Sequence, residues 1–324
     1  MTLGITSGSI ILNLFKPHLV INLMKIPITF LGTGAAIPTA RRNHISILLQ
    51  YKEENILIDC GEGTQRQLRK AKLNPCSITK ILITHWHGDH IFGLPGLLQT
   101  LSLNGYNKTL HIYIPKNTKH HLDLILKMFV FQGAIKYEIH EIESGIFFEN
   151  SDFKLEAEKM EHNTPALAYS FTEKEKIRIQ KSKLNKLKIE GKIIGELVKG
   201  KDIVWNNKKI RAKDITYTQE QKKITFILDT RINENMAKIA KESDLLVSES
   251  TFLEDSENGA RLAEEDYHLT AKQAAQTALK AKARKLVLVH LSQRYEANPK
   301  PLLTEARKIF KNTVIVEDFD KIEV

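Results

Sequence analysis

Three histidines and an aspartate fall within the six residues His85–His90, whose sequence is His-Trp-His-Gly-Asp-His. This segment directly follows the apolar run Ile81–Thr84, which is typical of a buried strand. In a packed core these polar groups would repel one another and lose their hydration. A loop at a strand end can instead turn alternate side chains into a common cavity. The pattern therefore predicts a metal site rather than a cluster of surface histidines.

The spacing within this loop divides the candidate ligands between two metal ions. His85 and His87 are expected to face one ion, and Asp89 and His90 a second. Imidazole and carboxylate ligands without a thiolate suit Zn²⁺, and also Mn²⁺ or Fe. Two ions need further ligands, and three polar residues far downstream each follow a predicted strand: His162, Asp229 and His290. Strand ends are a common place for functional side chains.

The elements that must position these residues follow from short apolar runs and from helical periodicity. The expected strands are Ile28–Leu31, Ile45–Leu49, Ile56–Ile58, Ile81–Thr84, Leu110–Ile114, Phe153–Glu158, Ile224–Leu228, Leu245–Val247, Leu286–Val289 and Val314–Val316. The expected helices are Gly63–Ala71, Leu94–Leu103, Lys119–Phe129, Asn233–Lys241, Thr270–Ala283 and Pro301–Phe310. Strands and helices alternate at both ends of the chain, which predicts an α/β (or α+β) fold of layered sheets and helices.

One segment, Thr172–Lys213, differs from the rest in composition. It holds twelve lysines and two arginines against five acidic residues, so it carries nearly all of the chain's net charge of +10. Its apolar residues are too few for a large core of its own. We therefore expect a protruding basic arm, at about residues 172–213, inserted into a single domain. The alternative is a solvated, lysine-rich surface helix.

The ends and the bulk composition set further expectations. Residues 1–23 lack the features of a secretory signal and are expected to be either a dispensable extension or the result of a start site assigned too early, so that the folded domain spans residues 24–324. Two cysteines, Cys60 and Cys76, are too few for a disulfide framework, which favours a reducing cytoplasm. No apolar run approaches the length of a membrane span, so no membrane partner is expected. The basic surplus favours a polyanionic partner, and a basic proteome or a merely soluble surface is the alternative explanation of the charge.

From Met24 onward the chain resembles the tRNase Z family of the metallo-β-lactamase superfamily. The matching segments are Phe30-Leu-Gly-Thr-Gly34, Pro38–Asn43, Asp59-Cys-Gly-Glu-Gly-Thr-Gln65, the loop His85–His90 with Gly93-Leu-Pro-Gly-Leu97, Asp229-Thr-Arg231, Glu249–Phe252, Tyr267–Thr270 and His290-Leu-Ser-Gln-Arg-Tyr295. The metal loop is common to the whole superfamily. The segments around residues 62–65 and 290–295, together with the basic arm, are more selective. The resemblance implies a four-layer αββα sandwich with the arm inserted in it.

The resemblance also assigns roles to residues of the metal site. It implies that one zinc ion is held by His85, His87 and His162, that the other is held by Asp89, His90 and His290, and that Asp229 bridges them. Asp59 would orient a ligand histidine. His268 and Glu249 resemble the proton-delivery pair of the family, and Asp89 could also take part in proton handling.

The activity implied is removal of the 3′ trailer from precursor tRNA by metal-assisted hydrolysis, leaving a 3′-hydroxyl on the tRNA and a 5′-phosphate on the trailer. The candidate substrate contacts are Ser292, Arg294 and Tyr295 for phosphate, Glu62 and Gln65 in a glycine-rich turn, and Arg42 and Asn43 for the acceptor end. The arm would grip the tRNA elbow, and the family pattern implies a homodimer in which it serves the other subunit.

Three other classes share part of this pattern. A hydrolase of a thioester, a lactone or a small phosphodiester would have the same metal loop but neither the arm nor the segment 290–295. A nuclease of mRNA ends would carry a large extra domain between the metal motifs, for which the spacing leaves no room. A non-catalytic tRNA-binding relative would be expected to lack ligands, and none of the seven is missing.

Overall fold

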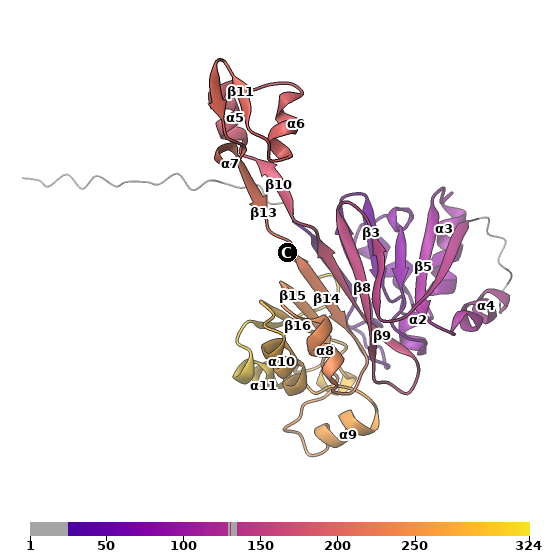
Figure 1. Cartoon of the computed structure of the whole chain (residues 1–324). Coiled ribbons are helices and arrows are strands. Elements are labelled where there is room, and N and C mark those ends of the chain that lie inside the picture. The colour runs from indigo at the N-terminus through magenta and orange to yellow at the C-terminus, as the bar shows by residue number, and fades with distance from the viewer. Residues whose placement is uncertain (1–24, 129, 131–134) are drawn as a thin grey trace, which may run out of the picture.

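The computed structural model describes residues 25–128, 130 and 135–324, and it contains two seven-stranded sheets that face each other (Figure 1). The first sheet has the order β18 (Lys321–Glu323), β1 (Pro27–Gly32), β2 (Ser46–Tyr51), β3 (Glu54–Ile58), β4 (Lys80–Leu82), β5 (Thr109–Pro115) and β6 (Lys136–Ile142). The second has the order β17 (Thr313–Ile315), β16 (Leu286–Val289), β15 (Leu245–Glu249), β14 (Lys223–Ile227), β9 (Ala166–Glu173), β8 (Phe153–Met160) and β7 (Gly145–Glu149).

Helices cover the outer face of each sheet. The first sheet is covered by α1 (Thr64–Lys70), α3 (Leu94–Leu103) and α4 (Lys119–Lys127), and the second by α8 (Glu234–Ile239), α10 (Ala271–Lys280) and α11 (Lys300–Ile309). The short helices α2 (Gly88–Ile91) and α9 (Gly259–Glu265) and the 3₁₀ turns η1 (Pro75–Ser77) and η2 (Gln293–Tyr295) lie in connecting segments.

Three apolar clusters separate the four layers and so explain the sandwich. One lies between the sheets, and one lies between each sheet and its helices. In β3, for example, Ile56 and Ile58 face the other sheet, whereas Leu57 faces the helices. Adjacent strand residues point to opposite faces, so a strand buried on both sides needs an unbroken apolar run. The predicted αββα sandwich is confirmed.

Every predicted strand and helix has a counterpart, but some elements were missed. The predicted helix Lys119–Phe129 ends at Lys127, and Phe129 lies outside the described residues, as do residues 1–24. The fully buried strand β9 was not expected, because its second half contains Ser170, Thr172 and Glu173. The buried Glu173 carboxylate accepts hydrogen bonds from Tyr51 (2.8 Å) and Gln219 (3.0 Å), which offset the cost of burial.

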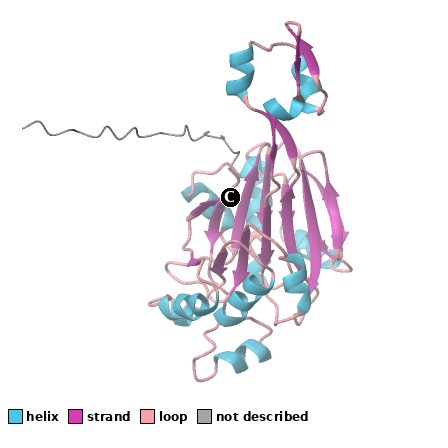
Figure 2. Cartoon of the chain, turned by 60° about the vertical axis from the view of Figure 1, so that its left-hand side comes forward, coloured by secondary structure: helices cyan, strands magenta, loops and turns pink. Residues whose placement is uncertain are grey.

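The basic arm projects from the sandwich as a continuation of two neighbouring strands (Figures 1 and 2). Its stalk pairs β10 (Lys176–Ile179) with β13 (Thr216–Gln219), and these strands continue β9 and β14. Its head contains α5 (Lys181–Leu187), α6 (Ile193–Val198), α7 (Ala212–Ile215) and the hairpin of β11 (Ile203–Trp205) and β12 (Lys208–Ile210). The arm thus begins after Glu173 and returns at about Lys222. The expected limits of 172 and 213 differ because Thr172 is paired inside the sheet and the return strand β13 was not recognised.

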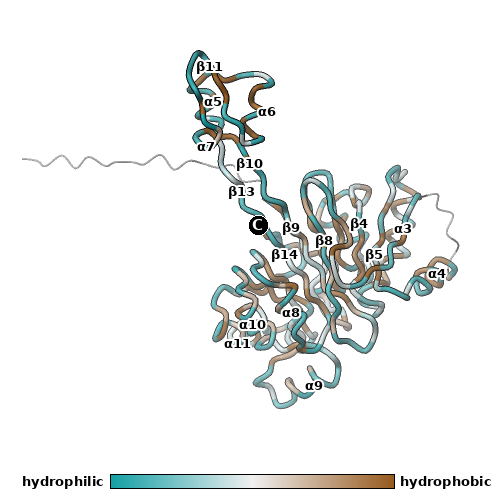
Figure 3. Tube along the Cα trace, in the orientation of Figure 1, coloured by the Kyte–Doolittle hydropathy of each residue, from teal (hydrophilic) through white to brown (hydrophobic). Residues whose placement is uncertain are grey.

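The head of the arm has a small apolar core of its own. Ile189, Leu197, Ile203, Ala212 and Ile215 are buried together, and Figure 3 shows hydrophobic segments within an otherwise hydrophilic head. The lysines therefore lie on a folded support rather than on a loose loop. Among the described helices, none has the length and apolar character needed to cross a bilayer.

Candidate metal centre

All seven predicted ligands lie at one edge of the sandwich. The loop after β4 comes from the first sheet, and the loops after β8, β14 and β16 come from the second. In each sheet these strands include parallel pairs, whose carboxyl ends lie at the same edge. The side chains that meet there are His85, His87, Asp89, His90, His162, Asp229 and His290.

The first group within this cluster contains His85, His87, His162 and Asp229. Nε2 of His85 lies 3.6 Å from Oδ2 of Asp229, and Nε2 of His162 lies 3.2 Å from Nδ1 of His87. His85 and Asp229 are buried, whereas the other two are half-buried. One side of the cluster is therefore open to solvent.

The second group contains Asp89, His90 and His290, and it shares Asp229 with the first. Oδ2 of Asp89 lies 3.3 Å from Nε2 of His90 and 3.3 Å from Nε2 of His290. Oδ2 of Asp229 lies 3.3 Å from Nε2 of His90, while its Oδ1 lies 3.2 Å from Nε2 of His290. The two oxygens of Asp229 thus face both groups, as a bridging carboxylate must.

Four of the histidines have Nδ1 close to an oxygen of the chain. The contacts are His85 with Thr84 Oγ1 (3.0 Å), His90 with Asp59 Oδ2 (2.6 Å), His162 with the Tyr267 carbonyl (3.1 Å) and His290 with Thr251 Oγ1 (3.0 Å). An N–H on Nδ1 leaves Nε2 as the atom with a free lone pair, and such partners usually orient ligand histidines. Each of these rings therefore presents Nε2 to the cluster.

Asp59 shows how firmly one of these rings is held. Its buried carboxylate accepts hydrogen bonds from the backbone N–H of Thr84 (2.7 Å) and from the Thr84 hydroxyl (2.7 Å), in addition to His90. The backbone of Asp59 is left-handed, with φ of 54°. Non-glycine residues adopt this conformation at an energetic cost and concentrate at functional sites.

Backbone contacts fix the loop 85–90 against the segment that follows β3. The N–H of Cys60 donates to the carbonyl of His90 (2.7 Å), and that of Gly93 donates to the carbonyl of Cys60 (2.9 Å). Gly61 is needed here, because a Cβ at this position would lie 2.5 Å from the carbonyl oxygen of Asp89. Two of the sequence motifs, residues 59–65 and 85–97, therefore act as one structural unit.

The chemistry of the cluster fits divalent cations. Nε2 of His85 and Nε2 of His90 are buried and form no hydrogen bond with any described residue. Burial lowers the pKa of His85 well below its usual value, which keeps the ring neutral and able to bind a metal. Burial would also lower the pKa of His90, but Asp229, Asp89 and Asp59 raise it well above normal. So many buried carboxylates require positive charge beside them.

His268 and Glu249 form a pair at the rim of the cluster. Nδ1 of His268 lies 3.2 Å from both carboxylate oxygens of Glu249, which also accepts hydrogen bonds from Thr230 N (2.8 Å) and Thr251 Oγ1 (2.6 Å). Burial alone would lower the pKa of His268, but the negative charges of Glu249 and Asp229 raise it to about 9. Glu249 and Asp229 therefore favour the protonated imidazole, and the contact of Nδ1 with Glu249 leaves Nε2 outside that pair.

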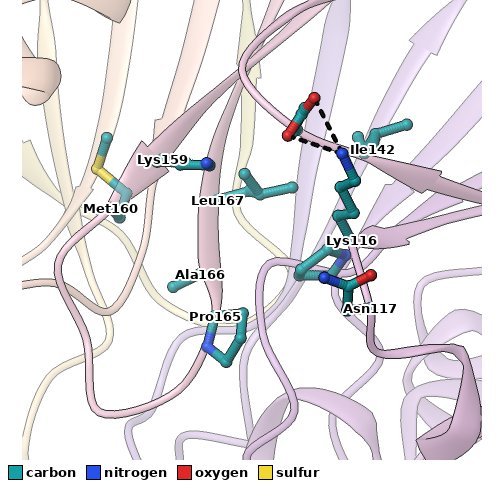
Figure 4. Close-up of a pocket in the computed structure, with 10 residues that line it drawn as sticks. Lys116, Asn117, Ile142, Lys159, Met160, Pro165, Ala166 and Leu167 are labelled. Atoms are coloured by element: carbon teal, nitrogen blue, oxygen red, sulfur yellow. Dashed lines mark hydrogen bonds and ion pairs between the residues drawn. The ribbon is translucent and has the colours of Figure 1, made fainter.

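A cavity of about 380 Å³ lies beside the turn between β8 and β9, and none of the seven predicted ligands lines it (Figure 4). Lys159–Met160 and Pro165–Leu167, which line it, flank His162 in the turn between β8 and β9. The N–H of Leu167 donates to the carbonyl of Thr84, next to the ligand loop (3.0 Å). Lys159 and the ion pair of Lys116 with Glu143 (3.3 Å) give this cavity a charged lining.

Arg42 corrects one expectation. It was predicted to contact substrate, but its side chain is buried and its guanidinium donates to Thr33 Oγ1 (2.7 Å) and to the carbonyl of Val316 (2.7 Å). Burial lowers its pKa, although nearby acidic residues oppose the shift. Arg42 thus holds the C-terminal segment against β1, and sequence alone could not distinguish this role from a surface contact.

The other predicted substrate contacts differ in exposure. The side chains of Arg294 and Glu62 are exposed. The side-chain amide of Asn43 donates to the carbonyl of Glu62 (2.7 Å), and the side chain of Gln65 packs against Gly96. The buried Ser292 accepts a hydrogen bond from the backbone N–H of Arg294 as the cap of η2. The Tyr295 hydroxyl accepts from the N–H of Leu253 (3.0 Å). Of this set, the side chains of Arg294 and Glu62 are the most accessible.

Several positioning groups were missed by the sequence analysis. Thr84, Thr251 and the carbonyl of Tyr267 support ligand histidines, and none of them forms part of a metal-binding motif. The guanidinium of Arg231 lies over the ring of Tyr267, 3.8 Å from its centre. The backbone N–H of Arg231 donates to the carbonyl of Glu161 (2.9 Å). Two signals were available: Thr84 directly precedes the ligand loop, and Thr251 and Tyr267 lie in the family-like segments 249–252 and 267–270.

Comparisons with known proteins find close relatives over nearly the whole chain. The ribonuclease Z of Methanosarcina acetivorans is 35% identical over 302 residues, which cover 92% of this chain and 97% of that protein. The ribonuclease Z of Thermococcus gammatolerans is 39% identical over 303 residues, covering 91% and 94%. The family described as "Anti-Pycsar protein Apyc1" matches residues 26–190.

Solved structures give the same picture. The crystal structure of the short form of human tRNase Z is similar with a TM-score of 0.65 and 28% identity, covering 91% of this chain and 98% of that one. The metallo-β-lactamase fold protein YhfI from Bacillus subtilis has a TM-score of 0.67 at 17% identity, covering 93% and 99%. The second likeness concerns the fold alone.

Proposed function

Because the chain belongs to the ribonuclease Z family, and over residues 26–190 also to the family of the Anti-Pycsar protein Apyc1, we infer that it is a metal-dependent endoribonuclease that removes the 3′ trailer from precursor tRNA. The arrangement of the cluster carries this inference. Four histidines are oriented through Nδ1, and one aspartate faces two groups of ligands. A phosphodiesterase that uses a pair of divalent cations needs such a site.

We propose that the cluster holds two Zn²⁺ ions, with Mn²⁺ or Fe as alternatives. His85, His87 and His162 would hold one ion, Asp89, His90 and His290 the other, and Asp229 both. Nitrogen and oxygen ligands without a thiolate suit these metals. When bound, the cations lower the pKa of water and stabilise the negative charge that develops on the phosphate.

His268 is proposed to be the proton donor to the leaving group. Cleavage on the 3′ side of the tRNA leaves a 3′-hydroxyl, so the departing oxygen needs a proton. Glu249 favours the protonated form of His268 and accepts at Nδ1, which would leave Nε2–H available for the leaving oxygen. Asp89 is a further candidate for proton handling, although its two histidine contacts favour a role as a ligand.

The arm is proposed to hold the tRNA away from the cut. His162 precedes β9 and Asp229 follows β14, whereas the arm joins these strands at their other ends. The eight residues of β9 alone span about 26 Å. This separation supports a homodimer in which the arm of one subunit grips tRNA cut by the other. The lysines of the arm would contact phosphates without reading sequence.

Surface contacts and compartment are further proposals. Arg294, which is exposed beside η2, can bind a phosphate with two parallel hydrogen bonds. Asn43, Glu62, Gln65, Ser292 and Tyr295 would shape the surface around it. Both cysteines are free, and Cys60 is fully buried, which supports a reducing compartment such as the cytoplasm.

One comparison of substrates tests the function. The purified protein should cleave a precursor tRNA at a single position, and sequencing of the ends should give a 3′-hydroxyl on the tRNA and a 5′-phosphate on the trailer. Bis(p-nitrophenyl) phosphate and a thioester serve as small substrates for the rival hydrolases. If the protein hydrolysed the thioester rapidly and left the precursor tRNA uncleaved, the proposal would be contradicted.

A further inference from the structure

Three side chains gather ligand atoms at the edge of the first sheet, outside the centre described above. His111 lies on β5, and Glu138 and His140 lie on the edge strand β6. The two strands are parallel, and His111 is the register partner of Glu138. Glu138 and His140 are two residues apart and so share one face of the strand.

The three ligand atoms have the spacing of a cation site. Nδ1 of His111 lies 3.1 Å from Nε2 of His140 and 3.5 Å from Oε2 of Glu138, and the latter two atoms are 4.0 Å apart. Tetrahedral zinc bonds of about 2.0–2.2 Å place ligand atoms about 3.3–3.6 Å from one another. In the catalytic cluster the corresponding separations are 3.2 to 3.6 Å. The edge cluster therefore needs only small side-chain adjustments.

The rings are supported and accessible. The ring of His140 stacks on Tyr113, with centroids 4.7 Å apart, and lies beside the ring of His111 at 5.3 Å. The side chains of His111, Glu138 and His140 are 33%, 48% and 36% exposed, so an ion can enter and keep a water ligand. The neighbouring amine of Lys80 is paired with Glu54 at 2.7 Å, which offsets its repulsion of a cation.

We propose that His111, Glu138 and His140 form a second type of metal site, which binds one Zn²⁺ ion separately from the catalytic centre. Two imidazoles and one carboxylate with an open position form a ligand set that zinc accepts. His111 pairs with Lys80 at the beginning of β4, whereas the ligand loop follows the end of that strand. The ion would cross-link β6 to β5 and so stabilise the exposed edge of the sheet.

Zinc stoichiometry tests this site without relying on catalysis. The protein is equilibrated with Zn²⁺ alone, and bound zinc per chain is measured for the wild type, His140→Ala, Glu138→Gln and His120→Ala. His120 is an exposed histidine of α4 outside the cluster, so its variant is the matched control. His140→Ala should bind one ion fewer than the wild type, Glu138→Gln should bind it more weakly, and His120→Ala should match the wild type.

The comparison between variants does not depend on how many ions the catalytic centre holds. Cleavage of precursor tRNA should be equal in all four proteins, which shows that each is folded. Equal zinc content in His140→Ala and the wild type would overturn the proposal. Loss of one ion from His120→Ala as well would also overturn it, because the extra zinc would then be bound by surface histidines in general.

Discussion

Asp59→Asn tests whether an outer carboxylate determines the metal affinity of the cluster. The change keeps the size of the side chain but replaces one acceptor oxygen with an amide NH₂. Asp59 accepts from His90 Nδ1 and twice from Thr84. The asparagine carbonyl can replace the contact to the backbone of Thr84, but its NH₂ would then face the Nδ1–H of His90. To avoid two opposed donors, His90 must move its proton to Nε2, the atom that faces the metal.

The expected loss can be estimated from this geometry. Outer partners of ligand histidines typically contribute about 10- to 100-fold in metal affinity. That range corresponds to about 1.4–2.8 kcal/mol. The free energy of unfolding of the metal-free protein should fall by only about 1–2 kcal/mol, since one Thr84 contact is kept. We therefore expect a loss of metal affinity in addition to the modest loss of stability of the metal-free protein.

Chelator competition measures the affinity, and urea denaturation of metal-free protein measures the stability. Tyr169→Phe is the matched control, because the Tyr169 hydroxyl donates to the carbonyl of Ile83 (2.6 Å) near the cluster without touching a ligand. Its removal should cost about 1 kcal/mol of stability and leave metal affinity unchanged. If Asp59→Asn bound metal as tightly as Tyr169→Phe, the reasoning about proton position would be refuted.

Three further outcomes are expected. His268→Ala should retain its full metal content but lose about 10²–10⁴-fold in precursor-tRNA cleavage, and unchanged cleavage would remove His268 from proton transfer. Replacing residues 175–220 by a short turn should greatly weaken tRNA binding measured by filter retention, yet spare hydrolysis of bis(p-nitrophenyl) phosphate; equal loss of both would contradict the division of labour. Glu54→Gln should reduce the free energy of unfolding by about 3 kcal/mol, because it leaves Lys80 buried without its partner. Burial favours the neutral form of Glu54, but hydrogen bonds from Lys80 and Thr79 lower its pKa below the ordinary 4.5. The Glu54–Lys80 ion pair therefore contributes fully above pH 4.5 and weakens as the pH falls through the folded pKa of Glu54. The free energies of unfolding of Glu54→Gln and the wild type should thus converge between pH 7 and pH 3.

Sequence reasoning succeeded where a local pattern reflects a physical need. The loop 85–90 after an apolar strand, and single polar residues such as Asp229 at other strand ends, predicted which side chains meet. The supporting atoms could not be predicted in this way. Thr251 and the carbonyl of Tyr267 reach ligand rings only because distant loops pack together.

The burial of Arg42 was missed for a related reason. A basic residue in a loop is usually solvated, and its two hydrogen-bond acceptors come from residues 9 and 274 positions away. Strand β9 was missed because a buried glutamate breaks the apolar pattern. Its partners, Tyr51 and Gln219, lie 122 and 46 residues away. Long-range partners of buried polar groups therefore set the limit of such predictions.

The stalk of the arm joins the sandwich through β9 and β14, which are adjacent and antiparallel. The chain therefore leaves and re-enters the body at points about 5 Å apart, which is the distance a tight hairpin turn also spans. Whatever is inserted there, long or short, leaves the pairing of these two strands unchanged. The geometry therefore allows the head to be lengthened, shortened or exchanged as a module without re-pairing β9 and β14, so the edge that carries the candidate ligands is left in place.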